Sequence, residues 1–262
     1  MDHGEGRVTR RALNQMTARD LPFEAFLDLA ADLGCVGVEP RNDLGRPFFD
    51  GADPAVAADM ARARGLRFLG LSEVYGFNVW DDERAGQIQA LIDVAAASGA
   101  ETISLIPTVD DRPTRALRDV MRDILSMVEG TGVLPLIEPI GFESSSLRGK
   151  ADLVAAIEAV GGFKLVHDTF QHVIAGETEI FPEHTGMVHI SGISDPDVPL
   201  DATQDAHRVL VDEQDRCDNP GQVRRFLEGG YAGVFSFEVT EPALIRAPNR
   251  DAIEASFRLL SL

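Results

Sequence analysis

Hydrophobic and polar positions along the chain repeat a two-part unit. A short apolar segment that ends in polar residues is followed by a longer amphipathic segment rich in Ala and Leu. The apolar segments predict strands at residues 11–16, 36–43, 67–74, 102–108, 134–140, 164–170, 187–193 and 234–240. The amphipathic segments predict helices at residues 23–34, 54–65, 82–99, 114–132, 151–162, 220–230 and 250–260, with a short, poorly formed segment after the sixth strand. A Gly after most of these helices is typical of a C-terminal cap.

This alternation predicts the fold. Strands that alternate with helices pair in parallel through crossover connections. Eight such units most economically close into a (β/α)₈ TIM barrel, and we expect one domain over residues 1–262. An open, doubly wound sheet is the alternative, but it usually has a Gly-rich phosphate-binding turn after its first strand. The segment "LNQMTARD" at residues 13–20 has no such turn.

Composition narrows the classes of function. Acidic residues outnumber basic ones 43 to 24, and the net charge of −19 argues against binding to nucleic acid or to anionic membranes. Cys35 and Cys217 are far apart and have no metal-binding spacing, which favours a reducing compartment over a disulfide scaffold. The first fifteen residues, "MDHGEGRVTRRALNQ", have no apolar signal core. We therefore expect a cytoplasmic protein whose partner is a small molecule.

Four ionisable residues stand inside otherwise apolar strands, close to their carboxyl ends. They are Glu138, Asp168, His189 and Glu238, and they come from four consecutive predicted strands. Functional groups of such barrels gather at this end. Three converging carboxylates would repel one another unless a cation lay between them. Three oxygen donors and one imidazole suit Mn²⁺, Mg²⁺, Co²⁺ or Zn²⁺. Any one of the four alone is more often a hydrogen-bonded structural group, but together they favour a site.

Other polar residues near the strand ends are candidates for substrate binding. Glu39, Arg41 and Asn42 cluster at the end of the second predicted strand, and Glu73 ends the third. They suit a polyol, although a hydrogen-bonded network at the rim is the alternative. His172 starts the segment after the sixth strand, where it either reaches a substrate hydroxyl or faces solvent.

The segments around the four strand-end residues resemble those of a known family. They are "LIEP" at 136–139, "HDTFQH" at 167–172, "VHISG" at 188–192 and "FSFEV" at 235–239. This pattern resembles the xylose isomerase-like TIM barrels, the sugar isomerase/epimerase superfamily, over nearly the whole chain. The resemblance implies that Glu138, Asp168, His189 and Glu238 bind one divalent metal ion. It also implies that the two glutamates are the catalytic acid/base groups, and that a homodimer is a common assembly.

Two further segments narrow the resemblance. "GVEPRNDLGRPFFDG" at 37–51 and "DEQDRCDNPGQ" at 212–222 are similar to the inosose (2-keto-myo-inositol) isomerase group of inositol catabolism. This similarity implies that Arg216 reaches the substrate; the alternative is a surface ion pair with Asp212 or Asp215. Many members have a His three residues after the metal-binding Asp, where this chain has Gln171 followed by His172. Relatives that act on DNA, such as endonuclease IV, use three metals and additional His ligands, and six histidines with an acidic balance argue against that activity.

The expected activity is an isomerase or epimerase reaction on an unphosphorylated keto-sugar or keto-inositol. Such a reaction removes a proton α to a carbonyl, forms an enediolate and returns the proton to the neighbouring carbon. Glu138 and Glu238 are predicted on non-adjacent strands and could flank the substrate. Only two lysines occur in the chain, Lys150 and Lys164, which favours a substrate without phosphate. A sugar-acid dehydratase, which starts from the same enediolate, and a non-catalytic sugar-binding barrel remain the alternatives.

Overall fold

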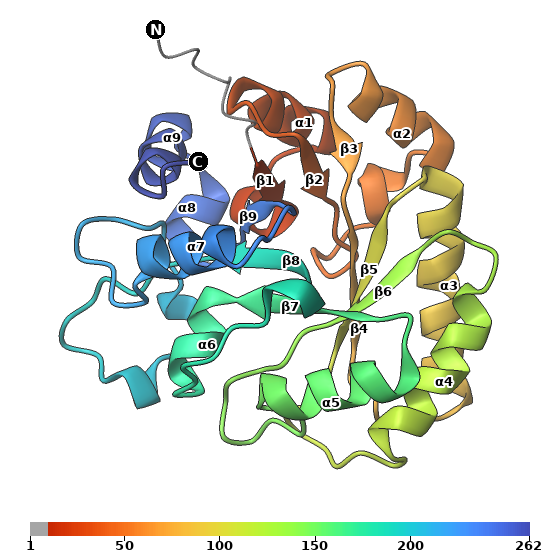
Figure 1. Cartoon of the computed structure of the whole chain (residues 1–262). Helices are drawn as coiled ribbons and strands as arrows, with labels where there is room; N and C mark the ends of the chain where they lie inside the picture. The colour runs from red at the N-terminus through yellow and green to blue at the C-terminus, as the bar shows by residue number, and fades with distance from the viewer. Residues whose placement is uncertain (1–9) are drawn as a thin grey trace, which may run out of the picture.

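The computed structural model describes residues 10–262 and shows a barrel of parallel strands surrounded by helices (Figure 1). The strands are β1 (Arg11–Asn14), β2 (Gly37–Glu39), β3 (Arg67–Phe68), β4 (Leu71–Tyr75), β5 (Thr102–Ile106), β6 (Leu134–Ile137), β7 (Lys164–Asp168), β8 (Thr185–Ile190) and β9 (Phe235–Phe237). The helices are α1 (Phe23–Asp32), α2 (Pro54–Arg62), α3 (Asp82–Ser98), α4 (Leu117–Val128), α5 (Lys150–Val160), α6 (Thr169–Ile174), α7 (Asn219–Glu228), α8 (Pro242–Arg246) and α9 (Arg250–Leu259). Most of the N-terminal segment that was read for a signal core, residues 1–9, lies outside the described residues.

The strand order confirms the predicted barrel. Neighbouring strands follow the order β3-β2-β1-β9-β8-β7-β6-β5-β4, and every paired neighbour is parallel. Its two ends, β3 and β4, are successive parts of the third predicted strand, so the chain itself joins them. The continuation of β2 also meets β4, because Asn42 N donates to Ser72 O at 2.9 Å and Ser72 N donates to Pro40 O at 3.1 Å.

The third strand is split in two, which the sequence pattern does not predict. Leu69 N donates to Val38 O of β2 at 2.9 Å, whereas Leu69 O accepts a hydrogen bond from the Thr102 hydroxyl of β5 at 2.9 Å. The strand therefore changes neighbours at this residue. Gly70 follows directly, and a Cβ there would lie 2.6 Å from Thr102 Oγ1, so only Gly fits the crossing.

Local signals in the sequence account for the helix ends. Asp81 caps α3, since its side chain accepts from Arg84 N at 2.7 Å, and Gly99 ends this helix in the left-handed conformation at φ 67°. Asp53 caps α2 in the same way, and Pro54 occupies its first turn. These local contacts fix where α2 begins and where α3 begins and ends.

A buried apolar layer fills the barrel below the polar strand ends. Its members are Ala12, Leu69, Leu136, Val166 and Met187, all at most 3% exposed. Side chains two positions apart on a strand point to the same face. The residues two positions after Leu136, Val166 and Met187 are Glu138, Asp168 and His189, so the apolar layer is the floor on which these polar groups lie.

Between residues 10 and 262, no helix has both the length and the apolar character that crossing a membrane requires.

Candidate metal centre

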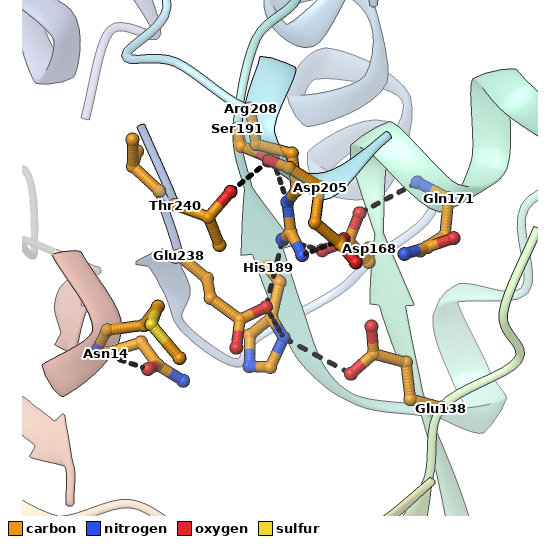
Figure 2. Close-up of polar contacts among 12 residues, drawn as sticks. Asn14, Glu138, Asp168, Gln171, His189, Ser191, Asp205, Arg208, Glu238 and Thr240 are labelled. Carbon is orange, nitrogen blue, oxygen red and sulfur yellow. Dashed lines mark hydrogen bonds and ion pairs between the residues drawn. The ribbon is translucent and has the colours of Figure 1, made fainter. Parts of the chain in front are cut away.

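Four side chains converge at the carboxyl end of the barrel (Figure 2). Glu138 and Glu238 directly follow β6 and β9, while Asp168 and His189 lie near the ends of β7 and β8. One potential ligand atom from each residue lies within 4.8 Å of those from the other three, and all four residues are buried. The structure thus brings together the four residues that the strand-end argument selected.

The imidazole of His189 is oriented by a carboxylate beneath it. Its Nε2 donates to Glu39 Oε2 at 3.0 Å, which leaves Nδ1 to face Glu238 Oε2 at 3.2 Å and Glu138 Oε2 at 3.5 Å. Although buried, Nδ1 has no hydrogen-bond partner in the structure. A carboxylate–histidine pair of this kind commonly presents the free nitrogen to a metal. The donor set therefore fits a divalent cation.

Electrostatics also favour a positive charge at this point. Burial by itself lowers the pKa of His189, but the carboxylates of Glu39 and Glu238 outweigh it and raise this pKa well above its usual value. A proton or a metal ion at Nδ1 would satisfy the same field, because either places positive charge among the carboxylates.

Two arginines make the glutamates unequal. Glu238 accepts from Arg41 Nη1 at 2.5 Å through Oε1 and from Arg208 Nη2 at 2.9 Å through Oε2. Burial raises the pKa of Glu238, but His189 and Arg208 outweigh it, with help from Arg41, and hold this pKa well below its usual value. Glu138 has no arginine contact among the described residues. Burial raises the pKa of Glu138 to about 7, against the opposing effect of His189.

Asp168 links the centre to the following helix. Its Oδ1 caps α6 by accepting from Gln171 N at 2.8 Å, while its Oδ2 accepts from Arg208 Nη2 at 2.5 Å. The carboxylate is fixed from both sides because a helix start and an arginine from a distant loop hold one oxygen each.

A cavity of about 350 Å³ is lined by Glu138 and Glu238. Its apolar wall is formed by Ile106, Val109, Ile140 and Phe142, and charged residues including Arg41 and Glu73 form much of the remainder. Gln171 also lines the cavity. Its Oε1 accepts from Gly141 N at 2.8 Å, so its amide nitrogen is left to donate to a bound molecule.

The six predicted substrate-binding residues divide into two groups. Arg41 and Glu73 line the cavity and are joined by an ion pair of 2.8 Å. The remaining four, Glu39, Asn42, His172 and Arg216, do not belong to its lining. Glu39 lies under His189, and Asn42 bonds the backbone of Glu73 through its side chain at 3.0 and 2.9 Å. Two of the four therefore hold neighbours of the cavity in place.

His172 and Arg216 point to other partners. His172 lies 3.0 Å from Lys150 Nζ and, unlike the adjacent Gln171, does not line the cavity. Arg216 donates to the carbonyls of Asp195 and Val198, each at 2.6 Å, and thereby fixes the loop after β8. His167 is fully buried and bonds Gln222 of α7 at 2.7 Å.

Arg208 is the main residue of the centre that the sequence pattern does not reveal. It lies in the long connection between β8 and α7, where no periodic pattern distinguishes it from other charged loop residues. Ser191, which accepts from Arg208 Nε at 3.0 Å, lies in the predicted strand at 187–193, but its role depends on Arg208 and is therefore not visible in the sequence pattern. Asp43, which accepts from Arg41 Nε at 2.8 Å, was also not predicted as a site residue. Only the folded chain brings these groups to the strand ends.

Comparison with known families now defines the class of protein. The model of the family described as xylose isomerase-like TIM barrel matches residues 27–261, so the chain belongs to this family. A comparison with curated proteins finds no match.

Solved structures agree with this fold. A xylose isomerase domain containing protein from Salmonella typhimurium LT2 is 29% identical, with a TM-score of 0.88, over 97% of this chain and 98% of that one. An IolI protein with a bound zinc atom superimposes with a TM-score of 0.84 at 17% identity, over 97% and 98%. L-ribulose 3-epimerase superimposes with a TM-score of 0.71 at 17% identity, over 97% and 86%.

The contact between Glu39 and His189 leads to a prediction about metal affinity. Glu39→Ala removes the acceptor that orients the imidazole, and such changes typically weaken metal binding about 10–100-fold. Glu39→Gln keeps an acceptor oxygen and should lose less. Calorimetric titration of the metal-free protein with Mn²⁺ measures both. Equal affinity in the alanine variant and the wild type would contradict this role of Glu39.

A second charged group lies behind α6. Glu177 accepts from Lys150 N at 2.7 Å and also from the Lys150 ammonium group. Burial raises the pKa of Glu177, but contacts with His172 and Lys150 outweigh it and lower this pKa from 4.5 to about 2. Because the folded pKa is depressed, the stabilisation is complete above about pH 4.5 and is lost as the pH falls toward 2.

We expect Glu177→Gln to lower the free energy of unfolding by about 1–2 kcal/mol at pH 7, since a charge-assisted contact is lost at a partly exposed group. The difference from wild type should shrink below pH 4.5. Urea unfolding at pH 7 and pH 3 measures it. Glu183→Gln is the control, because Glu183 is exposed and forms no ion pair within residues 10–262. A difference that is constant with pH would refute the assignment.

Proposed function

We propose that this protein is a metal-dependent isomerase or epimerase that acts on an unphosphorylated keto-sugar or keto-inositol. The observation that carries the proposal is the convergence of Glu138, Asp168, His189 and Glu238 within 4.8 Å at the edge of a cavity of about 350 Å³. Membership of the xylose isomerase-like family supports it, as does likeness to a zinc-containing IolI protein and to an epimerase. Of the substrates, 2-keto-myo-inositol is favoured by the segments at 37–51 and 212–222.

The four residues would hold one divalent ion, with His189 Nδ1 and the three carboxylates as ligands. The chemistry supplied by such an ion is polarisation of the substrate carbonyl, which makes the adjacent C–H more acidic. Asp168 accepts a hydrogen bond from Gln171 N, and His189 donates one to Glu39. Because these bonds fix both side chains, we assign Asp168 and His189 as ligands only.

Glu138 is the better placed of the two glutamates to accept a proton. In the proposed step, the carboxylate takes the proton from the carbon α to the carbonyl, and the C–H electron pair forms the enediolate. The same group then returns the proton to the neighbouring carbon, while the hydroxyl proton passes from the oxygen of the first carbon to the former carbonyl oxygen, so that the carbonyl changes place. Glu238 is a poorer proton carrier, since Arg41 and Arg208 hold one of its oxygens each. This inequality favours transfer by one base over epimerisation by two.

The cavity suits a neutral ring with hydroxyl groups. Ile106, Val109, Ile140 and Phe142 can cover the C–H face of a ring, while polar groups opposite can bind hydroxyls. A phosphate would meet a lining with five carboxylates, three arginines and no lysine, and two of the arginines, Arg41 and Arg208, are already paired with carboxylates. A dehydratase that eliminates a β-hydroxyl could use the same single base, so the product decides between the two reactions.

Turnover of a panel of substrates tests the proposed function. Keto-inositols, free ketoses and phosphorylated ketoses would be incubated with the Mn²⁺-supplemented enzyme and followed by NMR. We expect an isomeric product from a free keto-inositol or ketose. Loss of water would instead identify a dehydratase, and faster turnover of a phosphorylated sugar would contradict the proposed substrate class.

Substitution of the glutamates tests the proton transfer. Glu138→Gln should lose at least about 100-fold in turnover with excess metal, since acid/base groups contribute about 10²–10⁴-fold. Glu238→Gln should lose less once excess metal restores occupancy, because Arg41 and Arg208 already hold the two oxygens of Glu238. Asp168→Asn is the control and should recover at least partly as metal is added. Exchange of the substrate α-hydrogen in D₂O identifies the base. Exchange at the wild-type rate in Glu138→Gln would rule out Glu138.

A further inference from the structure

Arg208 is held firmly although it belongs to a long loop. Its backbone carbonyl accepts from Thr240 N at 3.2 Å and from Glu241 N at 3.0 Å, and the next residue, Val209, donates to Gly192 O at 3.0 Å. Its Nε donates to the Ser191 hydroxyl at 3.0 Å. The side chain is only 5% exposed. The guanidinium group is therefore placed by contacts on both sides, and it cannot swing freely out of the site.

A single nitrogen of this group joins two of the candidate metal ligands. Arg208 Nη2 lies 2.5 Å from Asp168 Oδ2 and 2.9 Å from Glu238 Oε2 (Figure 2). A cation thus already bridges two of the three carboxylates. A divalent ion that bound the same carboxylates would have to share them with this positive charge.

We propose that Arg208 is a positioning residue that acts as a built-in counter-cation for Asp168 and Glu238. It holds the two carboxylates together before metal binds, and it weakens metal binding by competing for them. This inference rests on the metal site of the proposed function. It assigns Arg208 a role on the metal ligands rather than on the substrate.

The matched control comes from the same loop. Arg216 is also a partly buried arginine of the β8–α7 connection, but its guanidinium donates to the backbone carbonyls of Asp195 and Val198. Arg208→Gln and Arg216→Gln therefore remove the same charge from one loop, and only the first removes it from the carboxylates.

The experiment compares full-length wild type and both variants after dialysis against a chelator. Thermal unfolding is measured with and without MnCl₂, and the Kd for Mn²⁺ is measured by calorimetry. Without metal, Arg208→Gln should unfold at a lower temperature than wild type, because two buried carboxylates lose their shared partner. On adding Mn²⁺, the unfolding temperature of Arg208→Gln should rise more than that of wild type. The Kd of this variant for Mn²⁺ should be at least about tenfold lower than that of wild type, since one nearby positive charge is gone. Arg216→Gln should bind Mn²⁺ like wild type.

Each outcome decides the inference. Arg208→Gln that folds only with Mn²⁺ supports it, and so does binding by the variant when wild type does not bind. Arg208→Lys, which keeps the charge, should have a Kd between those of wild type and Arg208→Gln. Equal or weaker binding by Arg208→Gln, with normal binding by wild type, overturns this inference and leaves the proposed function intact. If no form binds a divalent ion, both are overturned.

Discussion

The compensation of three buried carboxylates is the constraint on which this barrel mouth depends. Glu138, Asp168 and Glu238 are at most 6% exposed, and buried charge is costly unless it is paired. Within residues 10–262, Glu238 is paired with two arginines and Asp168 with one of them, whereas Glu138 has only the imidazole of His189. The centre is therefore incompletely neutralised, and the remaining demand for positive charge is concentrated between Glu138 and His189 Nδ1.

The barrel brings these groups together through strand geometry alone. Parallel strands of similar length end at one level, and alternate residues face the interior. Leu136, Val166 and Met187 form the apolar floor, and the residue two positions later on each strand reaches the centre. The floor excludes water from below, so the charges interact in a poorly screened environment. The packing of the floor and the closeness of the charges above it thus both follow from the two-residue period of the strands.

Much of this arrangement could be predicted from sequence because it depends on that periodicity. The barrel and the four converging side chains follow from apolar strands that end in ionisable groups. The sequence pattern did not predict which of two adjacent residues reaches the cavity. On α6, Gln171 faces the cavity and His172 faces Lys150, since adjacent helical residues point about 100° apart. Arg208 was not predicted because a loop has no hydrophobic period. The pairing of Glu39 with His189 was not predicted because it depends on the height of Glu39 within the barrel, which the sequence pattern does not give.

The loop that supplies Arg208 adds a non-periodic element to a site that is otherwise built from regular strand ends. Strand ends fix the positions of the ligands, but a loop residue sets how much positive charge they share. Arg208 contacts Asp168 and Glu238 and not Glu138, so it contributes directly to the difference between the two glutamates. Loss or movement of such an arginine would change both the demand for metal and the availability of Glu238 for proton transfer. One loop residue can therefore bias the same four ligands toward chemistry with one base or with two.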